Sequence, residues 1–578
     1  MKSRSLLQPN ITSFALYSIA GIICLYFFLS FLFFTLTSYW PGPLHDYWFE
    51  IPKIQDFFNN HLSWNELVTA HANAHRLVIP RLIFITDYVF FHGTNQLIII
   101  VSILCKLIML VLLNAIIKNE SFKTKILLNV LFFSTVFNSI NILNILNSSN
   151  VQWDLMAIFS CLSVYFYSNS FPIDKKKTGI YIALAYLFFI CAFFSQGGSL
   201  PVIFVFVLIA FLNRSLIGVV STVVFIGLVL YLMAYVFPVN DEDSPGLGSA
   251  IAMFIFKPWY VALFSFKLMS ANIYASDAIT FVFSAWSLFL FSIGLFFHKK
   301  TQHLSNNTLL YIACFCLLMM VFIAAFRVNF APNAWTSNRY HPNVLLFVLA
   351  VHLNAFLLAG TLFRKVTLTG CRIFLVLACI INLWMPQYYQ RSMAGDFANI
   401  VFDTQTSGLF YGPSQVSARR LVTSVHDFDK IAEADPFFRK FGFSYYANKQ
   451  GSSHYVQTRN PGERLISPEA VTDFEHNCPV NSDSINYSKA EDGINFKFST
   501  SIIQDPYAIF KTLFKRDTFY AIDATGIVTG YAYLYVDPEH YFSSLRVDGL
   551  SRSTTVKYIA EIKHNELVCR YVLNANTP

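Results

Sequence analysis

The chain has 578 residues, of which 55% are hydrophobic, 17% aromatic and only 13% charged, and its formal net charge at pH 7 is +8. With a mean hydropathy of +0.50, this composition excludes a water-soluble globule of such length. The sequence therefore predicts a polytopic α-helical membrane protein. It contains no phosphate-binding loop, zinc-type Cys/His spacing or Gly-x-Ser-x-Gly motif, and nothing in it is typical of nucleic-acid binding.

The first apolar run, residues 13–37, carries no charge. As a helix, its 25 residues would extend about 37 Å, against a hydrocarbon core of about 30 Å. It leads directly into SYWPGPLHDYW, without the small-residue cleavage site of a signal peptide. We therefore interpret it as a retained span.

Further apolar segments bring the predicted number of spans to about eleven. They cover residues 96–117, 126–140, 152–167, 179–194, 200–212, 216–237, 274–297, 309–326, 344–362 and 373–384. Two other apolar stretches, RLVIPRLIFITDYVFF and AIAMFIFKPWYVALFSF, contain charge and proline, and we interpret both as interfacial or re-entrant helices on the outer side.

The connections between the predicted spans alternate in charge. KNESFKTK, DKKK and HKK fall on the same side as Lys2 and Arg4, and the positive-inside rule makes that side cytoplasmic. Because the number of spans is odd, the chain after Trp384 is expected outside the cytoplasm. If either charged apolar stretch crosses the membrane, this parity changes.

Three regions follow from these patterns. Residues 1–390 form the predicted transmembrane region, in which 38–93 are the first outer loop with interfacial helices. Residues 391–484 are predicted to be a helical linker, because SQVSARRLVTSV and DFDKIAEADPFFRKF favour helices. From about Ile485 to the end, short alternating segments separated by turn residues predict an antiparallel, β-rich domain, so the C-terminal region as a whole is α+β.

Cys478 and Cys569 are the only cysteines after the predicted spans. In an oxidising compartment outside the cytoplasm, two such cysteines are expected to form a disulfide. The alternative is two unpaired buried thiols, because sequence does not show their separation.

Polar residues that the positive-inside rule does not explain gather in the predicted outer loops. Asp46, in the segment HDYWFEIP, is the candidate catalytic residue. An acid beside several cations suits a site that takes a proton from a hydroxyl and holds a phosphate leaving group. The alternative is that the charges are solvated and the nearby aromatic residues anchor the membrane interface. The candidate cations are His75, Arg76, Lys257 and Arg339.

These residues resemble the GT-C superfamily, integral-membrane glycosyltransferases with a catalytic acid in a long first outer loop. They are also similar to a group of bacterial multi-span proteins with Asp-Tyr-Trp, Asn-Glu-His-Arg and Arg-Tyr motifs. The chain departs from that pattern at Ala74, where the group has Glu. The matching residues are Asp46-Tyr47-Trp48, Asn73, His75-Arg76, Pro80-Arg81, Gln152-Trp153, Gly197-Gly198 and Arg339-Tyr340.

The resemblance implies a glycosyltransferase on the outer face of a bacterial inner membrane. Its donor would be a polyprenyl-phosphate sugar, and its acceptor an envelope glycan or lipid. Asp46 would be the base, and the substrate and its phosphate would contact His75, Arg76, Gln152, Trp153, Lys257, Arg339 and Tyr340. The cofactor is unknown, and the sequence supports no metal.

Two other classes of function stay open. A transporter or flippase for a lipid-linked saccharide would be expected to carry charged residues near the middle of the membrane and paired broken helices, and the sequence shows neither clearly. A non-catalytic envelope scaffold is favoured by Ala74, because the acid of the family pattern is missing there.

Overall fold

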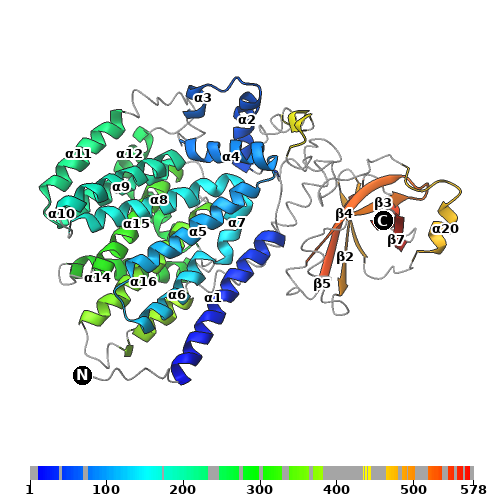
Figure 1. The fold of residues 1–578 in the computed structure, drawn as a ribbon. Coiled ribbons are helices and arrows are strands. Elements are labelled where there is room, and N and C mark those ends of the chain that lie inside the picture. The colour runs from blue at the N-terminus through cyan, green and yellow to red at the C-terminus, as the bar shows by residue number, and fades with distance from the viewer. Residues whose placement is uncertain are drawn as a thin grey trace, which may run out of the picture.

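In the computed structural model, each apolar segment predicted as a span overlaps a helix over most of its described residues (Figure 1). Long apolar runs form helices in a membrane because a helix satisfies its backbone hydrogen bonds internally. The structure describes residues 11–37, 42–43, 45–68, 76–171, 175–231, 247–271, 277–298, 304–328, 337–362, 369–370, 372–381, 434, 436–438, 440–443, 464–478, 485–490, 493–501, 518–536, 544–551, 556–563 and 566–572.

The helical part begins with α1 and ends, among the described residues, with a short apolar helix at Arg372–Ile381. Its α-helices are α1 (Ile11–Thr37), α2 (Ile51–Phe58), α3 (Trp64–Val68), α4 (Val78–Phe91), α5 (Gln96–Ile116), α6 (Phe122–Val136), α7 (Ile142–Leu146), α8 (Val151–Ser170), α9 (Lys175–Ser195), α10 (Pro201–Leu212), α11 (Leu216–Tyr231), α12 (Leu247–Phe256), α13 (Pro258–Leu268), α14 (Asp277–Phe297), α15 (Leu304–Arg327) and α16 (His341–Leu362). Its 3-10 helices are η1 (His45–Glu50), η3 (Ser139–Asn141), η4 (Ser148–Asn150), η5 (Gly197–Ser199) and η9 (Asn338–Tyr340).

The helices form a bundle with a buried centre and an apolar outside. α16 is apolar around its whole circumference and almost entirely buried, with α6, α14 and α15 packed against it. In contrast, α11 exposes Val220, Val223 and Val224. Exposed apolar faces of this kind are stable in contact with lipid, which supports a helical membrane protein.

Fewer helices are both long enough and apolar enough to cross a membrane than the eleven spans that the sequence predicts. In the described part of the chain, five helices are long and apolar enough to cross a membrane: Gln96–Ile116, Thr178–Ser195, Ala278–Phe297, Asn307–Arg327 and His341–Ala359. Four more predicted spans coincide with apolar helical stretches of 10–17 residues in the described part: Tyr17–Phe33 (within α1), Gly197–Leu212, Leu216–Tyr231 and Arg372–Ile381. The spans predicted at 126–140 and 152–167 fall on α6 and on the 20-residue α8, which do not meet the combined criterion of length and hydropathy. The charged stretch around Lys257 forms two short helices, α12 and α13, which are broken at that residue.

The span predicted at residues 126–140 is displaced toward the N-terminus, since α6 also has 15 residues but covers Phe122–Val136. α6 ends at Val136, and the chain then passes through η3, α7 and η4 before α8 begins. Non-helical backbone at membrane depth is tolerated where it is buried in protein or lines a cavity.

The junction of α4 and α5 is closed by a buried carboxylate. Asp87 accepts hydrogen bonds from the backbone N–H groups of Asn95 and Leu97, each at 2.8 Å, and so caps the start of α5. Burial raises the pKa of Asp87 to about 6, although these two N–H groups act in the opposite direction. The folded state therefore binds a proton at Asp87 more tightly than the unfolded chain does.

This difference predicts a pH-dependent stability. The contribution of Asp87 is fully present below the ordinary pKa of 3.8 and is lost as pH rises through about 6. The shift corresponds to about 3 kcal/mol. Thermal unfolding from pH 4 to pH 7 should therefore show wild type losing stability relative to Asp87→Asn, which cannot ionise. Parallel pH profiles of the two proteins would contradict this prediction.

The antiparallel sheet predicted from about Ile485 is present as a body separate from the bundle (Figure 1). Its seven strands are ordered β1-β2-β5-β4-β3-β6-β7, and each neighbouring pair is antiparallel. At the turn after β3, Gly526 has φ +83, and a Cβ there would lie 2.4 Å from the Ile466 carbonyl oxygen. The strands are β1 (Ile485–Ala490), β2 (Gly493–Ser501), β3 (Thr518–Asp523), β4 (Val528–Val536), β5 (Ser544–Ser551), β6 (Val556–Lys563) and β7 (Glu566–Val572).

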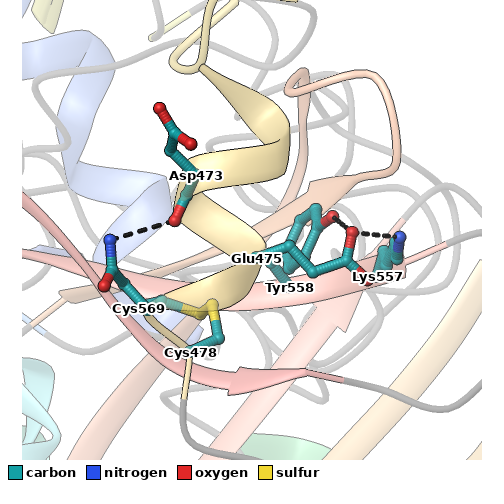
Figure 2. The surroundings of a disulfide bond; sticks show 7 residues. Asp473, Glu475, Cys478, Lys557, Tyr558 and Cys569 are labelled. Atoms are coloured by element: carbon teal, nitrogen blue, oxygen red, sulfur yellow. Dashed lines mark hydrogen bonds and ion pairs between the residues drawn. A yellow bond between two sulfur atoms is a disulfide. The ribbon is translucent and has the colours of Figure 1, made fainter. Parts of the chain in front are cut away.

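A short helix, α20 (Val471–His476), is joined to this sheet by a disulfide and by polar contacts (Figure 2). Cys478, just after α20, is bonded to Cys569 on β7, with the two Cα atoms 5.1 Å apart. Beside the bond, Glu475 accepts from Lys557 at 2.8 Å and from the Tyr558 hydroxyl at 3.0 Å. The disulfide therefore connects segments 91 residues apart in sequence.

Thiol labelling can test this bond directly. When the unreduced protein is denatured and treated with a maleimide, we expect Cys478 and Cys569 to stay unlabelled, while Cys161 and Cys316, which are free in the structure, are labelled. After reduction, all four residues should react. Labelling of Cys478 and Cys569 before reduction would show that the bond is absent.

The predicted helical linker, residues 391–484, lies mostly outside the described residues. A described part of it packs against the first predicted outer loop. Phe438 lies with its ring centroid 6.0 Å from that of Trp48, and the ring of Phe443 is edge-on to Tyr88 at 5.1 Å. An aromatic contact therefore links the chain after the spans to the segment that contains Asp46.

Candidate functional site

The candidate catalytic residue Asp46 forms an ion pair with Arg339. The guanidinium Nη1 of Arg339 lies 3.3 Å from Oδ2 of Asp46, although the two residues are 293 positions apart. Asp46 lies on η1, after α1, and Arg339 lies on η9, before α16. Their side chains are 28% and 27% exposed, respectively, so an incoming molecule can reach both.

Neighbouring groups hold Arg339 in place. Its Nε donates to the Ser337 hydroxyl at 3.0 Å, and its guanidinium carbon lies 5.7 Å from the centre of the Tyr340 ring. Burial acts to lower the pKa of Arg339, but Tyr340 and Asp46 outweigh it and raise the pKa above its ordinary value. Tyr340 is itself buried, edge-on to Trp153 at 5.2 Å. Arg339 is therefore a fixed cation.

The residues next to Asp46 and next to Trp153 in the sequence include buried polar atoms without partners. The Tyr47 hydroxyl, the Trp48 indole nitrogen and the Gln152 side-chain oxygen are buried and make no hydrogen bond. Each such group costs about 1–3 kcal/mol in folding free energy. Unsatisfied buried groups of this kind call for a functional or structural explanation. Here they belong to the same sequence motifs as Asp46 and the Trp153–Tyr340 contact.

The second acid of the HDYWFEIP segment has a different environment. Glu50 and Arg81 form a two-point ion pair, with Oε2 2.6 Å from Nε and Oε1 3.2 Å from Nη2. Both side chains are 2% exposed. Arg81 also donates to the Leu67 carbonyl at 2.8 Å. This pair joins η1 to α4, whereas Asp46 on the same short helix is accessible.

The other predicted cations do not contact Asp46 in the part of the chain that the structure describes. Arg76 is buried and donates to the Val68 carbonyl at 3.2 Å. Burial, and then the charge of Arg81, lower its pKa. Lys257 is exposed at the break between α12 and α13. His75 lies outside the described residues. Of the predicted cations with described positions, only Arg339 is paired with Asp46.

Sequence reasoning missed a buried ion pair inside the bundle. Nζ of Lys106 lies 2.9 Å from Oδ1 of Asp154, and the side chains are only 6% and 5% exposed. Lys106 lies in the middle of α5, and Asp154 in the first turn of α8. The sequence did not clearly show a charge in the middle of a predicted span, and Lys106 is such a charge. A lone lysine within an otherwise apolar span was the available signal.

A second missed feature is a row of asparagines at every third position between α6 and α8. This asparagine row consists of Asn138, Asn141, Asn144, Asn147 and Asn150. Asn141 lies on the 3-10 helix η3, Asn144 on the α-helix α7, and Asn150 on the 3-10 helix η4. All but Asn147 are buried, and Asn150 donates to the Asn144 side-chain oxygen at 3.1 Å.

No cluster of three or more His, Cys, Asp or Glu residues that could hold a metal ion occurs among the described residues. The donor set around Asp46 is one carboxylate facing a guanidinium, which favours binding of an anion by Arg339 over binding of a cation. Comparison with known proteins adds no relative, since no family model, curated protein or solved structure matches the chain.

Proposed function

We propose that this membrane protein is a GT-C-type glycosyltransferase, which moves a sugar from a polyprenyl-phosphate donor to an envelope glycan or lipid. The observation that carries the proposal is the accessible Asp46–Arg339 ion pair, with buried and unpartnered polar groups in adjacent positions. A carboxylate and a fixed guanidinium supply the two functions of such a reaction, a proton acceptor and an anion holder.

The proposed mechanism uses the ion pair as an exchangeable contact. The phosphate of the donor binds Arg339 in place of Asp46. The Asp46 carboxylate is then no longer paired with the guanidinium. The acceptor hydroxyl then attacks the anomeric carbon, and Asp46 takes its proton. A new glycosidic C–O bond forms as the bond between the anomeric carbon and the phosphate oxygen breaks. Polyprenyl phosphate leaves with the electron pair, and hydrogen bonds from Arg339, worth about 1.5–3 kcal/mol each, stabilise its charge.

The proposed function also includes a membrane topology with eleven spans. Eleven spans place the N-terminus in the cytoplasm and the Asp46 site on the outer face of a bacterial inner membrane. The β-rich domain then lies outside the cytoplasm. The distribution of basic connections and the Cys478–Cys569 disulfide support this arrangement.

Transfer in a reconstituted system tests the function. The purified protein would be placed in liposomes with radiolabelled polyprenyl-phosphate sugars and a membrane-envelope extract as the source of acceptors. We expect label to move from the lipid donor into a product, and to do so only when the protein is present. No transfer from any donor, with folded protein confirmed by thermal unfolding, would contradict the proposal.

A transporter of lipid-linked saccharides is the second candidate, and the Lys106–Asp154 pair favours it. Ionisable residues buried inside spans often line substrate or proton pathways. The two functions differ in product. A flippase moves the intact labelled donor from one leaflet to the other, whereas a transferase cleaves it. Measuring the sidedness and the chemical identity of the label in one experiment separates them.

A further inference from the structure

One member of the asparagine row, Asn147, joins two elements that pack against the segments of the Asp46–Arg339 ion pair. η4 lies against η1, which carries Asp46, with Cα atoms of the two elements within 8 Å of each other. α7 lies equally close to η9, which carries Arg339. Because Asn147 is the single residue between α7 and η4, it is close to both segments of the ion pair.

Asn147 differs from the rest of the asparagine row in exposure and in its hydrogen bonds. The other four asparagines are buried, whereas Asn147 is half-buried. Its Oδ1 accepts from the Ser149 hydroxyl at 2.8 Å, which holds the plane of the amide. Its Nδ2 makes no hydrogen bond with a described residue, and this atom is not sealed from solvent. Asn147 therefore presents an oriented amide N–H group to an incoming molecule.

The ion pair also has polar atoms that are unused and accessible. Arg339 donates through Nε and Nη1, and its Nη2 makes no hydrogen bond within the described part of the chain. Asp46 accepts through Oδ2, and its Oδ1 is likewise without a described partner. Neither atom is sealed from solvent. This region therefore offers a ligand one acceptor, from Asp46, and two donors, from Arg339 and Asn147.

The two donors suit different parts of a ligand. A guanidinium is charged and favours an anionic oxygen, such as that of a phosphate. The free group of Asn147 is neutral and can only donate, because the oxygen of the same amide is already used by Ser149. It therefore favours a neutral oxygen acceptor. Hydroxyl oxygens are the neutral acceptors that every sugar carries.

We propose that Asn147 is a specificity-determining residue, which donates a hydrogen bond from Nδ2 to a hydroxyl oxygen of the sugar to be transferred. This assignment rests on the proposed function, since it takes the ligand of the Asp46–Arg339 pair to be a lipid-phosphate sugar. Arg339 then holds the phosphate, and Asn147 selects the sugar attached to it. Ser149 is a positioning residue, because its hydroxyl holds the amide of Asn147.

Binding measurements on the full-length protein in micelles test this contact without requiring turnover. The probes are farnesyl phosphate and its esters with mannose, glucose, galactose and arabinose, and the Kd of each is measured by titration calorimetry. For the sugar that binds most tightly, esters that each lack one hydroxyl are compared with the parent. We expect wild type to bind one of these deoxy esters about 3- to 10-fold more weakly, the effect of losing one net hydrogen bond.

Asn147→Ala should bind that deoxy ester and its parent equally, and it should keep the wild-type ratios at the other hydroxyl positions. Its Kd for farnesyl phosphate without a sugar should not change, because Arg339 holds the phosphate. Ser149→Ala should retain only part of the preference. Asn59→Ala, at an exposed asparagine after α2 in the same predicted outer loop, is the matched control and should keep every wild-type ratio.

Three results would overturn the proposal. Equal binding of all deoxy esters by wild type would mean that Nδ2 of Asn147 contacts only water. A preference that survives in Asn147→Ala would assign the contact to another residue. Weaker binding of farnesyl phosphate itself by this variant would make Asn147 a phosphate ligand or a structural residue.

The liposome assay separates this proposal from the proposed function. A sugar preference that depends on Asn147, without any transfer, would keep the contact and reject the transferase. Transfer by wild type together with an unchanged preference in Asn147→Ala would reject only the contact. Failure of wild type to bind any of the sugar esters would reject both.

Discussion

Asp46→Asn should lower the rate of sugar transfer by about 100-fold or more, the usual size of a general-base contribution. Asparagine has nearly the same shape as aspartate, and its side-chain oxygen can still accept a hydrogen bond from Arg339 at the 3.3 Å position of the present contact. It cannot take a proton from the acceptor hydroxyl. The measurement is the initial rate of transfer from a radiolabelled lipid donor in liposomes, at matched amounts of folded protein.

The matched control for Asp46→Asn is Glu66→Gln in the same predicted outer loop. Glu66 is half-buried and forms a capping box with Ser63 at the start of α3, accepting the Ser63 N–H at 2.6 Å. Glutamine serves equally well at that position of a capping box, so this variant should transfer at nearly the wild-type rate. A near-normal rate for Asp46→Asn would instead make Asp46 a structural residue of the loop and favour the scaffold function.

Arg81→Met should destabilise the protein by about 3–5 kcal/mol, because it leaves the Glu50 carboxylate buried without its main partner. Both side chains of this pair are 2% exposed, so water cannot replace the lost contact. Lys53 lies 3.7 Å from Glu50 and will offset part of the loss. The free energy of unfolding, measured by denaturant titration in micelles with refolding checked, gives the effect.

A double substitution separates the cost of an unpaired charge from the value of the pair. Glu50→Met with Arg81→Met removes both charges and should recover most of the lost stability, since apolar replacements of buried pairs are often neutral or stabilising. Lys53→Met, which removes a half-buried contact to the same carboxylate, should cost no more than about 1 kcal/mol. A double variant as unstable as Arg81→Met alone would contradict the explanation.

Much of the fold could be predicted because apolar runs and strand alternation are local patterns. Residues 96–117 and 344–362 fall on α5 and α16, and the sheet begins at Ile485 as expected. Asp46 and Arg339, two of the candidate site residues, are in contact in the structure, and their shared role in a site stays a prediction. It rested on the residue types in separate loops, since no local pattern joins positions so far apart.

The other features of the fold and the site depend on which charged side chains pair with each other, and the sequence does not specify these pairs. Glu50 and Asp46 lie on one short helix, but only the packing of α4 makes Glu50 a buried partner of Arg81. Lys106 is recognisable as a charge in a span, whereas its pairing with Asp154 requires the approach of α5 to α8. The early end of α6 is likewise a tertiary effect, since the apolar run continues to Ile140.

The asparagine row restricts which changes in chain length this segment can accept. Asn144 lies on α7, an α-helix with 3.6 residues per turn, so one residue added between Asn141 and Asn144 would turn every later asparagine by about 100°. The side-chain amides that are now buried would then point toward neighbouring residues whose side chains are apolar. We expect this stretch to accept exchange of Ile142 or Ile145 for other aliphatic residues far more readily than the gain or loss of a single position. The number of residues between the asparagines is therefore the constrained property of this segment, and single insertions or deletions are the most sensitive test of it.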